Sequence, residues 1–259
     1  MLNIRFGDLQ FLNVYPLHFG LEDRLSTFSS DYRIIRKQGT PRELNQAMLA
    51  YDLDISLVSS AVYLDHIDRF IPLGPLIGSY GPVRSVLLFS SKKEREIRTI
   101  ALPGESATSI ELLRILWQQP GCLAPEASLP QADARLLIGD RALFLAAQEE
   151  PLWDLASQWQ SEQALPFVFG LWVAERKWQQ RYPEAFSAMQ DLLITAFQVG
   201  LLHMASWLPD VANQFNLSSD VLNEYFQKNL VYFPNADLMA GLRRFQELRK
   251  AVHRATSFG

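Results

Sequence analysis

Hydroxyl side chains at the end of an expected strand are the groups in this sequence best suited to bind a charged ligand. Ser106-Ala107-Thr108-Ser109 stands between an expected strand and an expected helix. A helix that starts there directs unpaired backbone N–H groups and three hydroxyls toward one point, which favours an anion such as a carboxylate. Ordinary helix capping uses the same residue types, so this segment alone does not decide between the two roles.

Further polar residues follow expected strands in the first part of the chain. Ser59-Ser60 and Thr40 have the same two interpretations as the 106–109 segment, and their common placement at strand ends favours a carboxylate-binding cleft. Asn13 follows the first expected strand and can offer its amide to a substrate hydroxyl. Its alternative role is to turn the chain by bonding to nearby backbone.

Several other residues have both a functional and a structural interpretation. Asp140 follows a buried strand and is either a base or a helix cap, and capping is the more common use of an aspartate there. Arg84 enters an expected strand and either binds a carboxylate or points to solvent. The aromatic residues Phe167, Phe169 and Trp172 favour core positions, and Phe167 is the best candidate among them for a ligand contact.

Familiar reactive constellations are missing from the sequence. His18, His66, His203 and His253 are scattered, and none has ligand-like spacing to Cys122 or to another histidine, so we expect no metal. The sequence has neither a Gly-rich phosphate-binding loop nor a serine at a strand elbow. We therefore expect no cofactor and no serine nucleophile.

Composition indicates a two-lobed protein with a small-molecule ligand. The 259 residues, 48% hydrophobic and 20% charged, suffice for two cores of about 100–150 residues each. A net charge of −4 without a basic patch argues against a nucleic-acid partner. The sequence has no stretch of about 18 consecutive apolar residues, so we expect no membrane span. The N-terminal residues do not resemble a secretory signal and Cys122 is the only cysteine, so we expect a cytoplasmic protein.

Strands and helices alternate along most of the chain. Residues 40–43, Thr-Pro-Arg-Glu, predict a helix start with a capping box. The expected strands lie at 3–8, 31–37, 54–58, 97–102 and 132–138. The expected helices lie at 16–25, 106–117, 142–147, 153–159, 183–207, 218–227 and 236–252.

Two apolar runs, 81–90 and 165–173, bracket the middle of the chain. Both are rich in β-branched and aromatic residues, which predicts buried strands. We expect 82–89 and 165–172 to be adjacent crossing strands between two α/β lobes. Residues 1–85 and 173–259 would form a discontinuous first lobe with C-terminal helices, and 86–172 an inserted second lobe, with the ligand cleft between them. This is the layout of the type II periplasmic-binding-protein fold, an α/β class.

Seven short motifs, in order, resemble one family over nearly the whole chain. They are Asn13 within Leu-Asn-x-x-Pro-Leu, Gly39-Thr40-Pro41-x-Glu43-Leu44-Asn45, Val58-Ser59-Ser60, Gly81-Pro82-Val83-x-Ser85-Val86, Ser106-Ala107-Thr108-Ser109, Leu137-Ile138-Gly139-Asp140 and Leu165-Pro166-Phe167-Val168-Phe169. The sequence resembles the chorismate dehydratases of the futalosine route to menaquinone. Gly78-Ser79-Tyr80-Gly81 departs from the Ser-Arg-Gly that is more usual in that family and offers no charged contact there.

The resemblance implies conversion of chorismate to 3-[(1-carboxyvinyl)oxy]benzoate and water. The ring proton next to the enolpyruvyl ether is removed and the neighbouring hydroxyl expelled, and the enolpyruvyl carboxylate of the substrate can itself act as the base when the pocket fixes its conformation. Asn13 would contact the leaving hydroxyl, and one substrate carboxylate would bind at 106–109 and the other at 59–60. The implied substrate site comprises Thr40, Ser59, Ser60, Gly81, Val83, Ser85, Ser106, Ala107, Thr108, Ser109, Gly139, Asp140 and Phe167.

Two other functions stay open at this point. The 1,4-dihydroxy-6-naphthoate synthase of the same pathway shares the fold, but it carries a histidine-glutamate pair where Gly139-Asp140 stands here, and glycine cannot accept a proton. A non-catalytic cytoplasmic protein that binds a small carboxylate is the second alternative, because this fold binds more often than it reacts.

Overall fold

The chain folds into two compact units, each with its own sheet. The computed structural model describes residues 1–25, 28, 31–117, 123–125 and 131–257, so Cys122 lies outside the described residues. Unit 1 comprises Met1–Ile77, Gly170–Asn223 and Tyr232–Pro234. Unit 2 comprises Gly78–Phe169, Glu224–Val231 and Asn235–Gly259. Both units combine a sheet with helices, as the α/β prediction requires.

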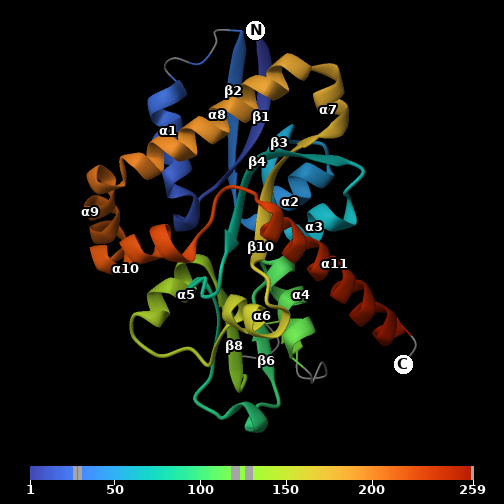
Figure 1. Cartoon of the computed structure of the whole chain (residues 1–259), viewed down its shortest axis with the longest axis vertical. Helices are drawn as coiled ribbons and strands as arrows, with labels where there is room; N and C mark the ends of the chain where they lie inside the picture. Colours follow the sequence, from blue (N-terminus) through green and yellow to red (C-terminus); the bar gives the residue numbers. More distant parts are fainter. Residues whose placement is uncertain (26–27, 29–30, 118–122, 126–130, 258–259) are drawn as a thin grey trace. The chain divides into compact units, whose positions relative to one another are not determined.

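The sheet of unit 1 has the strand order β2-β1-β3-β10-β4 (Figure 1). Its strands are β1 (Leu2–Leu9), β2 (Tyr32–Gly39), β3 (Ile55–Ser59), β4 (Phe70–Ser79) and β10 (Phe167–Glu175). The first three run parallel to one another, since β1 pairs in parallel with β2 and with β3. β10 runs antiparallel to β3, with Gly170 opposite Ser59. The carboxyl ends of β1, β2 and β3 therefore meet at one edge of the sheet.

Helices cover the sheet of unit 1, and two of them pack very closely. They are η1 (Leu12–Val14), α1 (Tyr15–Leu25), α2 (Pro41–Leu49), α3 (Ser60–Asp65), α7 (Arg176–Arg181), α8 (Pro183–Leu202), α9 (Met204–Phe215) and α10 (Ser219–Glu224). α1 and α8 lie side by side (Figure 1). A Cβ on Gly200 would lie 1.8 Å from the carbonyl oxygen of Pro16, so α8 requires glycine at this contact.

α8 is also the helix to examine for a membrane span. Among the described residues, it alone is long and apolar enough to span a membrane, by length and composition. A core helix of a folded domain meets the same criteria, and α8 buries Met189, Leu193, Ala196 and Phe197. Its contact with α1 is the kind of packing expected of such a core helix.

The sheet of unit 2 has the strand order β7-β6-β8-β5-β9. Its strands are β5 (Val86–Phe89), β6 (Ile100–Leu102), β7 (Leu123–Pro125), β8 (Ala134–Ile138) and β9 (Trp153–Asp154). β6 and β8 are parallel, whereas β5 is antiparallel to β8 and pairs Val86 with Ile138. The start of β5 therefore lies at the same edge as the carboxyl ends of β6 and β8.

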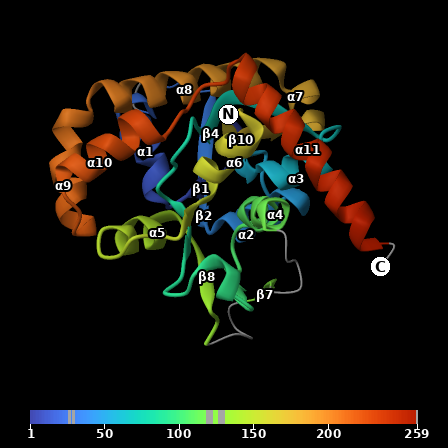
Figure 2. The same ribbon diagram turned by 60° about the horizontal axis from the view of Figure 1, so that its bottom comes forward.

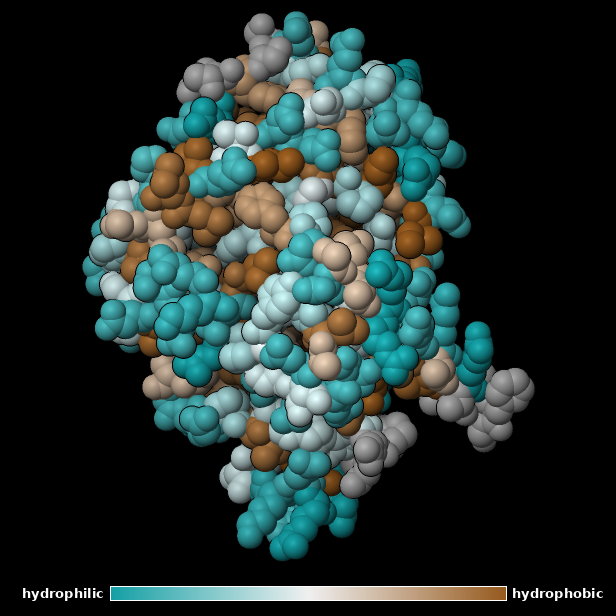
Figure 3. Space-filling model, in the orientation of Figure 1, coloured by the Kyte–Doolittle hydropathy of each residue, from teal (hydrophilic) through white to brown (hydrophobic). Residues whose placement is uncertain are grey.

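Helices flank the sheet of unit 2 on both sides. They are η2 (Glu94–Glu96), α4 (Ala107–Leu116), α5 (Gly139–Ala146), α6 (Leu155–Gln163), the π-helical turn η5 (Tyr225–Asn229) and α11 (Ala236–Ser257). α4 and α5 lie on opposite sides of β8 (Figure 2). The core between the elements includes the fully buried Leu88, Leu113 and Trp159. The charged turn around η2 forms a hydrophilic tip of this unit (Figure 3).

We expected residues 82–89 and 165–172 to be adjacent crossing strands, and this prediction is wrong for 82–89. β10 lies beside β4 in the sheet of unit 1, whereas residues 86–89 form β5 in the sheet of unit 2. β4 contains Pro72, Gly74 and Pro75, which weaken a strand pattern in the sequence. Prolines are tolerated there because β4 is an edge strand of its sheet.

The unit boundaries also differ from the expected lobes. We expected 86–172 as the inserted lobe and all of 173–259 in the first, whereas the units change at 77/78 and 169/170, and 224–231 and 235–259 belong to unit 2. α11 packs on unit 2 because its side chains bind there. Nε of Arg244 donates to Gln163 at 2.9 Å, and Nε2 of His253 lies 2.6 Å from the buried Glu111 of α4.

Candidate active site

Four predicted site residues of unit 1 lie at the carboxyl ends of its parallel strands. Asn13 follows β1 within η1, Thr40 follows β2, and Ser59 and Ser60 end β3 and begin α3. We call this set the unit 1 edge. Parallel pairing of β1 with β2 and β3 brings these positions to the same edge, where α/β sheets bind ligands.

The hydroxyls of the unit 1 edge are engaged in helix capping. Thr40 forms the predicted capping box with Glu43, whose carboxylate accepts hydrogen bonds from the backbone N–H of Thr40 at 2.8 Å and from its hydroxyl at 3.0 Å. These bonds lower the pKa of Glu43. Ser59 caps α3 and accepts from Nδ2 of Asn45 at 3.3 Å, while Ser60 is buried. The hydrogen bond from Asn45 thus connects α2 to the end of β3, and the sequence analysis did not identify this contact.

Asn13 differs from these capping residues. Its Oδ1 is buried and has no hydrogen-bond partner among the described residues. η1 is capped by Phe11 without a side-chain bond, and Asn13 lies within this turn. A buried acceptor without a partner requires an explanation, and an ordered water or a bound ligand supplies one.

A charged cluster that the sequence analysis did not predict lies at the same end of β1. The buried carboxylate of Asp8 lies 2.9 Å from Nε2 of His18 and accepts from Nε of Arg36 at 3.0 Å. Asp8, His18 and Arg36 come from β1, α1 and β2, and only their pairing in space reveals them. The cluster connects these three elements behind the unit 1 edge.

A second set of predicted residues lies at one edge of the sheet of unit 2. Ser85 precedes β5, Gly139 and Asp140 follow β8, and Ser106 to Ser109 follow β6 and begin α4. We call this set the unit 2 edge. The backbone N–H of Gly139 donates to the carbonyl of Ser85 at 2.8 Å, and Gly139 has a φ of +60°. These residues follow or precede three strands at one edge of the sheet, and Ser85 and Gly139 are in direct contact.

The start of α4 has the geometry of a capped helix. Oγ of Ser106 accepts from the backbone N–H of Ser109 at 3.2 Å and donates to Oγ of Ser109 at 2.7 Å. Thr108 and Ser109 are buried, whereas Ser106 is half-buried and Ala107 is exposed. An anion at this helix start would therefore meet Ser106 and the backbone around Ala107 before the hydroxyl of Thr108.

Asp140 does not cap α5. The helix begins at Gly139 after Ile138, and no side chain caps it. Asp140 instead lies in the first turn of α5, where its negative charge is favoured by the helix dipole. The prediction that Asp140 caps this helix is therefore wrong, because Asp140 lies two residues after the N-cap position.

The loop before β5 is held by an aspartate that the sequence analysis did not identify. Oδ2 of Asp154 accepts from the backbone N–H of Arg84 at 2.7 Å, and its Oδ1 caps α6 by accepting from Ala156 and Ser157. Burial raises the pKa of Asp154, against the effect of these backbone donors. The loop carries the predicted residues Gly81, with a φ of +84°, and Val83, which is buried.

Phe167 lies in an aromatic cluster of unit 2. Its ring centroid is 5.2 Å from that of Trp159 and 5.0 Å from that of Phe245, and 1% of the residue is exposed. This placement favours the core role that the sequence analysis weighed against a ligand contact.

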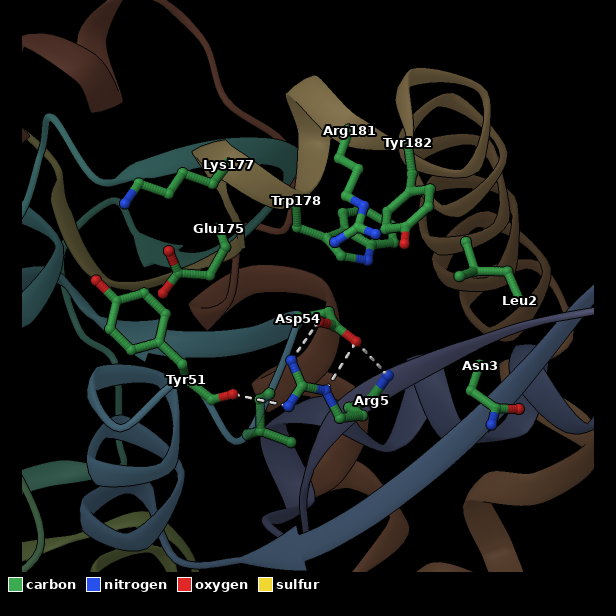
Figure 4. A pocket seen from close by; sticks show the side chains of 11 residues that line it. Leu2, Asn3, Arg5, Tyr51, Asp54, Glu175, Lys177, Trp178, Arg181 and Tyr182 are labelled. Carbon is green, nitrogen blue, oxygen red and sulfur yellow. Dashed lines mark hydrogen bonds and ion pairs between the residues drawn. The ribbon is translucent and has the colours of Figure 1, made fainter.

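A separate pocket of about 370 Å³ lies at the other end of the strands of unit 1 (Figure 4). Arg5 at the start of β1 donates to Asp54 from its backbone N–H at 2.8 Å and from Nη2 at 2.6 Å, and Trp178, Arg181 and Tyr182 complete the wall. None of the predicted site residues lines this pocket. No group of three or more metal-ligating side chains occurs among the described residues.

Comparison with known proteins identifies the family of the chain. A family model described as menaquinone biosynthesis matches residues 4–251. The chain belongs to this menaquinone-biosynthesis family. The matched range includes every predicted site residue of both edges.

Curated relatives of this menaquinone-biosynthesis protein include two chorismate dehydratases. The protein of Thermus thermophilus is 33% identical over 194 residues, which cover 65% of this chain and 68% of that protein. The protein of Campylobacter jejuni is 27% identical over 173 residues, which cover 66% of this chain and 68% of that protein.

Solved structures confirm the fold class of the menaquinone-biosynthesis protein. A protein of Archaeoglobus fulgidus has a TM-score of 0.69 at 15% identity and covers 96% of this chain and 97% of its own. The alkanesulfonate-binding protein of Xanthomonas axonopodis, bound to MOPS, has a TM-score of 0.70 at 16% identity. The match covers 97% of this chain and 93% of that protein. The fold is therefore that of periplasmic binding proteins, as the strand and helix order predicted.

Proposed function

We propose that this protein is an enzyme that dehydrates chorismate to 3-[(1-carboxyvinyl)oxy]benzoate, in the futalosine route to menaquinone. The observation that carries the proposal is the family match over residues 4–251, together with two relatives that are chorismate dehydratases. The activity is that of a carbon-oxygen lyase, and the substrate is a small molecule with two carboxylates.

The reaction breaks two bonds of the substrate and forms an aromatic ring. The proton on the ring carbon that carries the enolpyruvyl ether is removed, the hydroxyl on the neighbouring carbon departs, and the two leave together as water. The enolpyruvyl carboxylate of chorismate lies within reach of that proton and acts as the base. Fixing its conformation by binding lowers the barrier through proximity, an effect worth up to about 7–11 kcal/mol in well-oriented systems.

The residues of the two edges suit positioning better than proton transfer. Asn13 is a half-buried residue whose side-chain Nδ2 can donate a hydrogen bond to the oxygen of the departing hydroxyl, where negative charge develops. Within unit 2, Ser106 and the helix start beside it suit a carboxylate, and within unit 1, Ser59 also suits one. Gly139 stands where the naphthoate synthase has its basic histidine, which favours the dehydratase.

Ultraviolet absorbance of chorismate mixed with the purified protein tests the proposal. Turnover should convert the spectrum of chorismate into that of a substituted benzoate, and mass spectrometry should show a product lighter by one water. Thermal stabilisation by chorismate without any spectral change would instead identify a binding protein. The matched control is heat-denatured protein, since chorismate also decomposes without a catalyst.

A further inference from the structure

The π-helical turn η5 is the strongest feature that the proposed function does not use. It spans Tyr225–Asn229, and the i+5 hydrogen bond from the N–H of Leu230 to the carbonyl of Tyr225, at 3.1 Å, closes it. Single π turns within helical segments occur frequently at functional sites. η5 belongs to unit 2, which the chain enters at Glu224, the last residue of α10.

Tyr225 joins η5 to the unit 2 edge. Its phenol is fully buried and hydrogen-bonded to the side chain of Ser85. Burial raises the pKa of Tyr225, and the negative charge of Asp140 raises it further, so the phenol stays protonated. η5 therefore contacts the unit 2 edge at Ser85.

Backbone pairing brings the other end of η5 to the loop before β5. Val231 and Gly78 form an antiparallel bridge, with N–H to carbonyl distances of 2.8 and 2.9 Å. η5 ends at Asn229, two residues before Val231. The bridge therefore holds the end of η5 near Gly78, where the segment that leads to Gly81 and Ser85 begins.

Asn229 carries a buried acceptor that nothing in the described part of the chain satisfies. The residue is 5% exposed, and its Oδ1 has no hydrogen-bond partner among the described residues. Tyr225 and Asn229 are four residues apart, close to one π turn, so their side chains leave the turn on the same side. The free oxygen of Asn229 thus faces the side on which Tyr225 meets Ser85.

We propose that Asn229 is a specificity-determining residue of the substrate site, whose Oδ1 accepts a hydrogen bond from the hydroxyl of chorismate. This inference rests on the proposed function. A hydroxyl has one donor hydrogen and two acceptor lone pairs, so donation to Asn229 leaves its oxygen able to accept from another group. A site that satisfies a buried acceptor only with a substrate hydroxyl rejects ligands that lack the hydroxyl.

The reaction product supplies the decisive comparison, because 3-[(1-carboxyvinyl)oxy]benzoate keeps both carboxylates and lacks the hydroxyl. Asn229→Leu should lower kcat/KM for chorismate about tenfold, the loss of one hydrogen bond in a buried site. The inhibition constant of the product should stay within about twofold. The melting temperature should stay equal or rise, since an apolar side chain of similar size replaces an unsatisfied polar group. Gln227→Leu, on the exposed face of the same turn, is the matched control and should change neither constant.

The outcomes separate this inference from the proposed function. If wild-type protein converts chorismate and Asn229→Leu weakens substrate and product equally, or neither, the role of Asn229 is overturned while the dehydratase function stands. If wild-type protein binds chorismate without converting it, dissociation constants for chorismate and the product replace the kinetic constants in the same comparison. A wild-type protein that neither converts nor binds chorismate overturns both. Asn229→Ala serves in the same assays if the leucine variant fails to fold.

Discussion

The backbone N–H of Arg84 donates a 2.7 Å hydrogen bond to Oδ2 of Asp154, and Arg84 holds this position with a φ of +63°. A left-handed conformation costs a residue other than glycine about 1–2 kcal/mol. The carboxylate that stabilises this turn also caps α6 through Ala156 and Ser157. One half-buried side chain therefore fixes both a helix start and the loop that delivers Ser85 to the unit 2 edge.

Removal of this carboxylate should affect stability and ligand binding together. We expect Asp154→Ala to lower the free energy of unfolding by about 1–2 kcal/mol through the lost cap. It should also weaken chorismate binding, because the loop from Gly81 to Ser85 loses its attachment. Denaturant unfolding and calorimetric titration measure the two effects. Ser218→Ala removes the cap that bonds the N–H of Val221 in unit 1, and as the control it should lower stability alone.

The stability of unit 2 should depend on pH through Asp133. Lys92 and the backbone N–H groups of Arg98 and Thr99 lower the pKa of Asp133 from 3.8 to about 2. A lowered pKa in the folded state stabilises the fold above the unfolded pKa, and this contribution is lost as the pH falls through the folded value. The difference in unfolding free energy between wild type and Asp133→Asn should therefore be constant above pH 5 and shrink from about pH 4 to about pH 2. A difference that stays constant across this range would show that Asp133 has an ordinary pKa.

The contact between α1 and α8 should not tolerate a side chain at Gly200. A Cβ there would lie 1.8 Å from the carbonyl oxygen of Pro16, and backbone must move to relieve the clash. We expect Gly200→Ala to lower the free energy of unfolding by about 1–3 kcal/mol, although alanine favours a helix. Gly104→Ala is the matched control, since no atom lies within 4 Å of its Cβ and it should leave stability nearly unchanged. Equal melting temperatures for the two variants would contradict the close packing.

Residues with local signals were predictable from the sequence, and those that depend on pairing in space were not. The capping box at Thr40 and the helix start at Ser106 are contained within four residues each, and the structure has both. β4 was missed because its prolines and glycine hide an edge strand, and the neighbouring β5 took its place in the expected hinge.

Two residues of the site were missed for the same reason, because their roles depend on contacts between distant parts of the chain. Asp154 acts on Arg84, 70 residues away, and Tyr225 acts on Ser85 from a turn that reads as part of an ordinary helix. No period or motif marks such contacts, because they depend on which chain segments the fold brings together. The segment 224–231 joins unit 2 between stretches of unit 1, and the sequence has no composition change there.

Asp140 should be dispensable if the substrate supplies the base. It lies in the first turn of α5, so Asp140→Asn should lower the free energy of unfolding by only about 0.3–1 kcal/mol through the helix dipole. We expect kcat to fall by less than about tenfold, since no proton passes through this carboxylate. Steady-state kinetics and melting temperature give the two quantities. Loss of all turnover in a folded Asp140→Asn protein would identify Asp140 as the base.

Asn13 should matter to the transition state and little to the fold. Its Oδ1 makes no hydrogen bond to the described residues, so Asn13→Ala loses no hydrogen bond of this oxygen and should leave the melting temperature nearly unchanged. A hydrogen bond donated by Nδ2 to the departing hydroxyl strengthens as the carbon-oxygen bond breaks, so kcat should fall by about tenfold to a hundredfold while KM changes less. The matched control is Asn45→Ala, which breaks a bond to Ser59 within the same edge and should lower stability. A variant of Asn13 that unfolds more easily but keeps the kcat of wild type per folded molecule would show that Asn13 only shapes its loop.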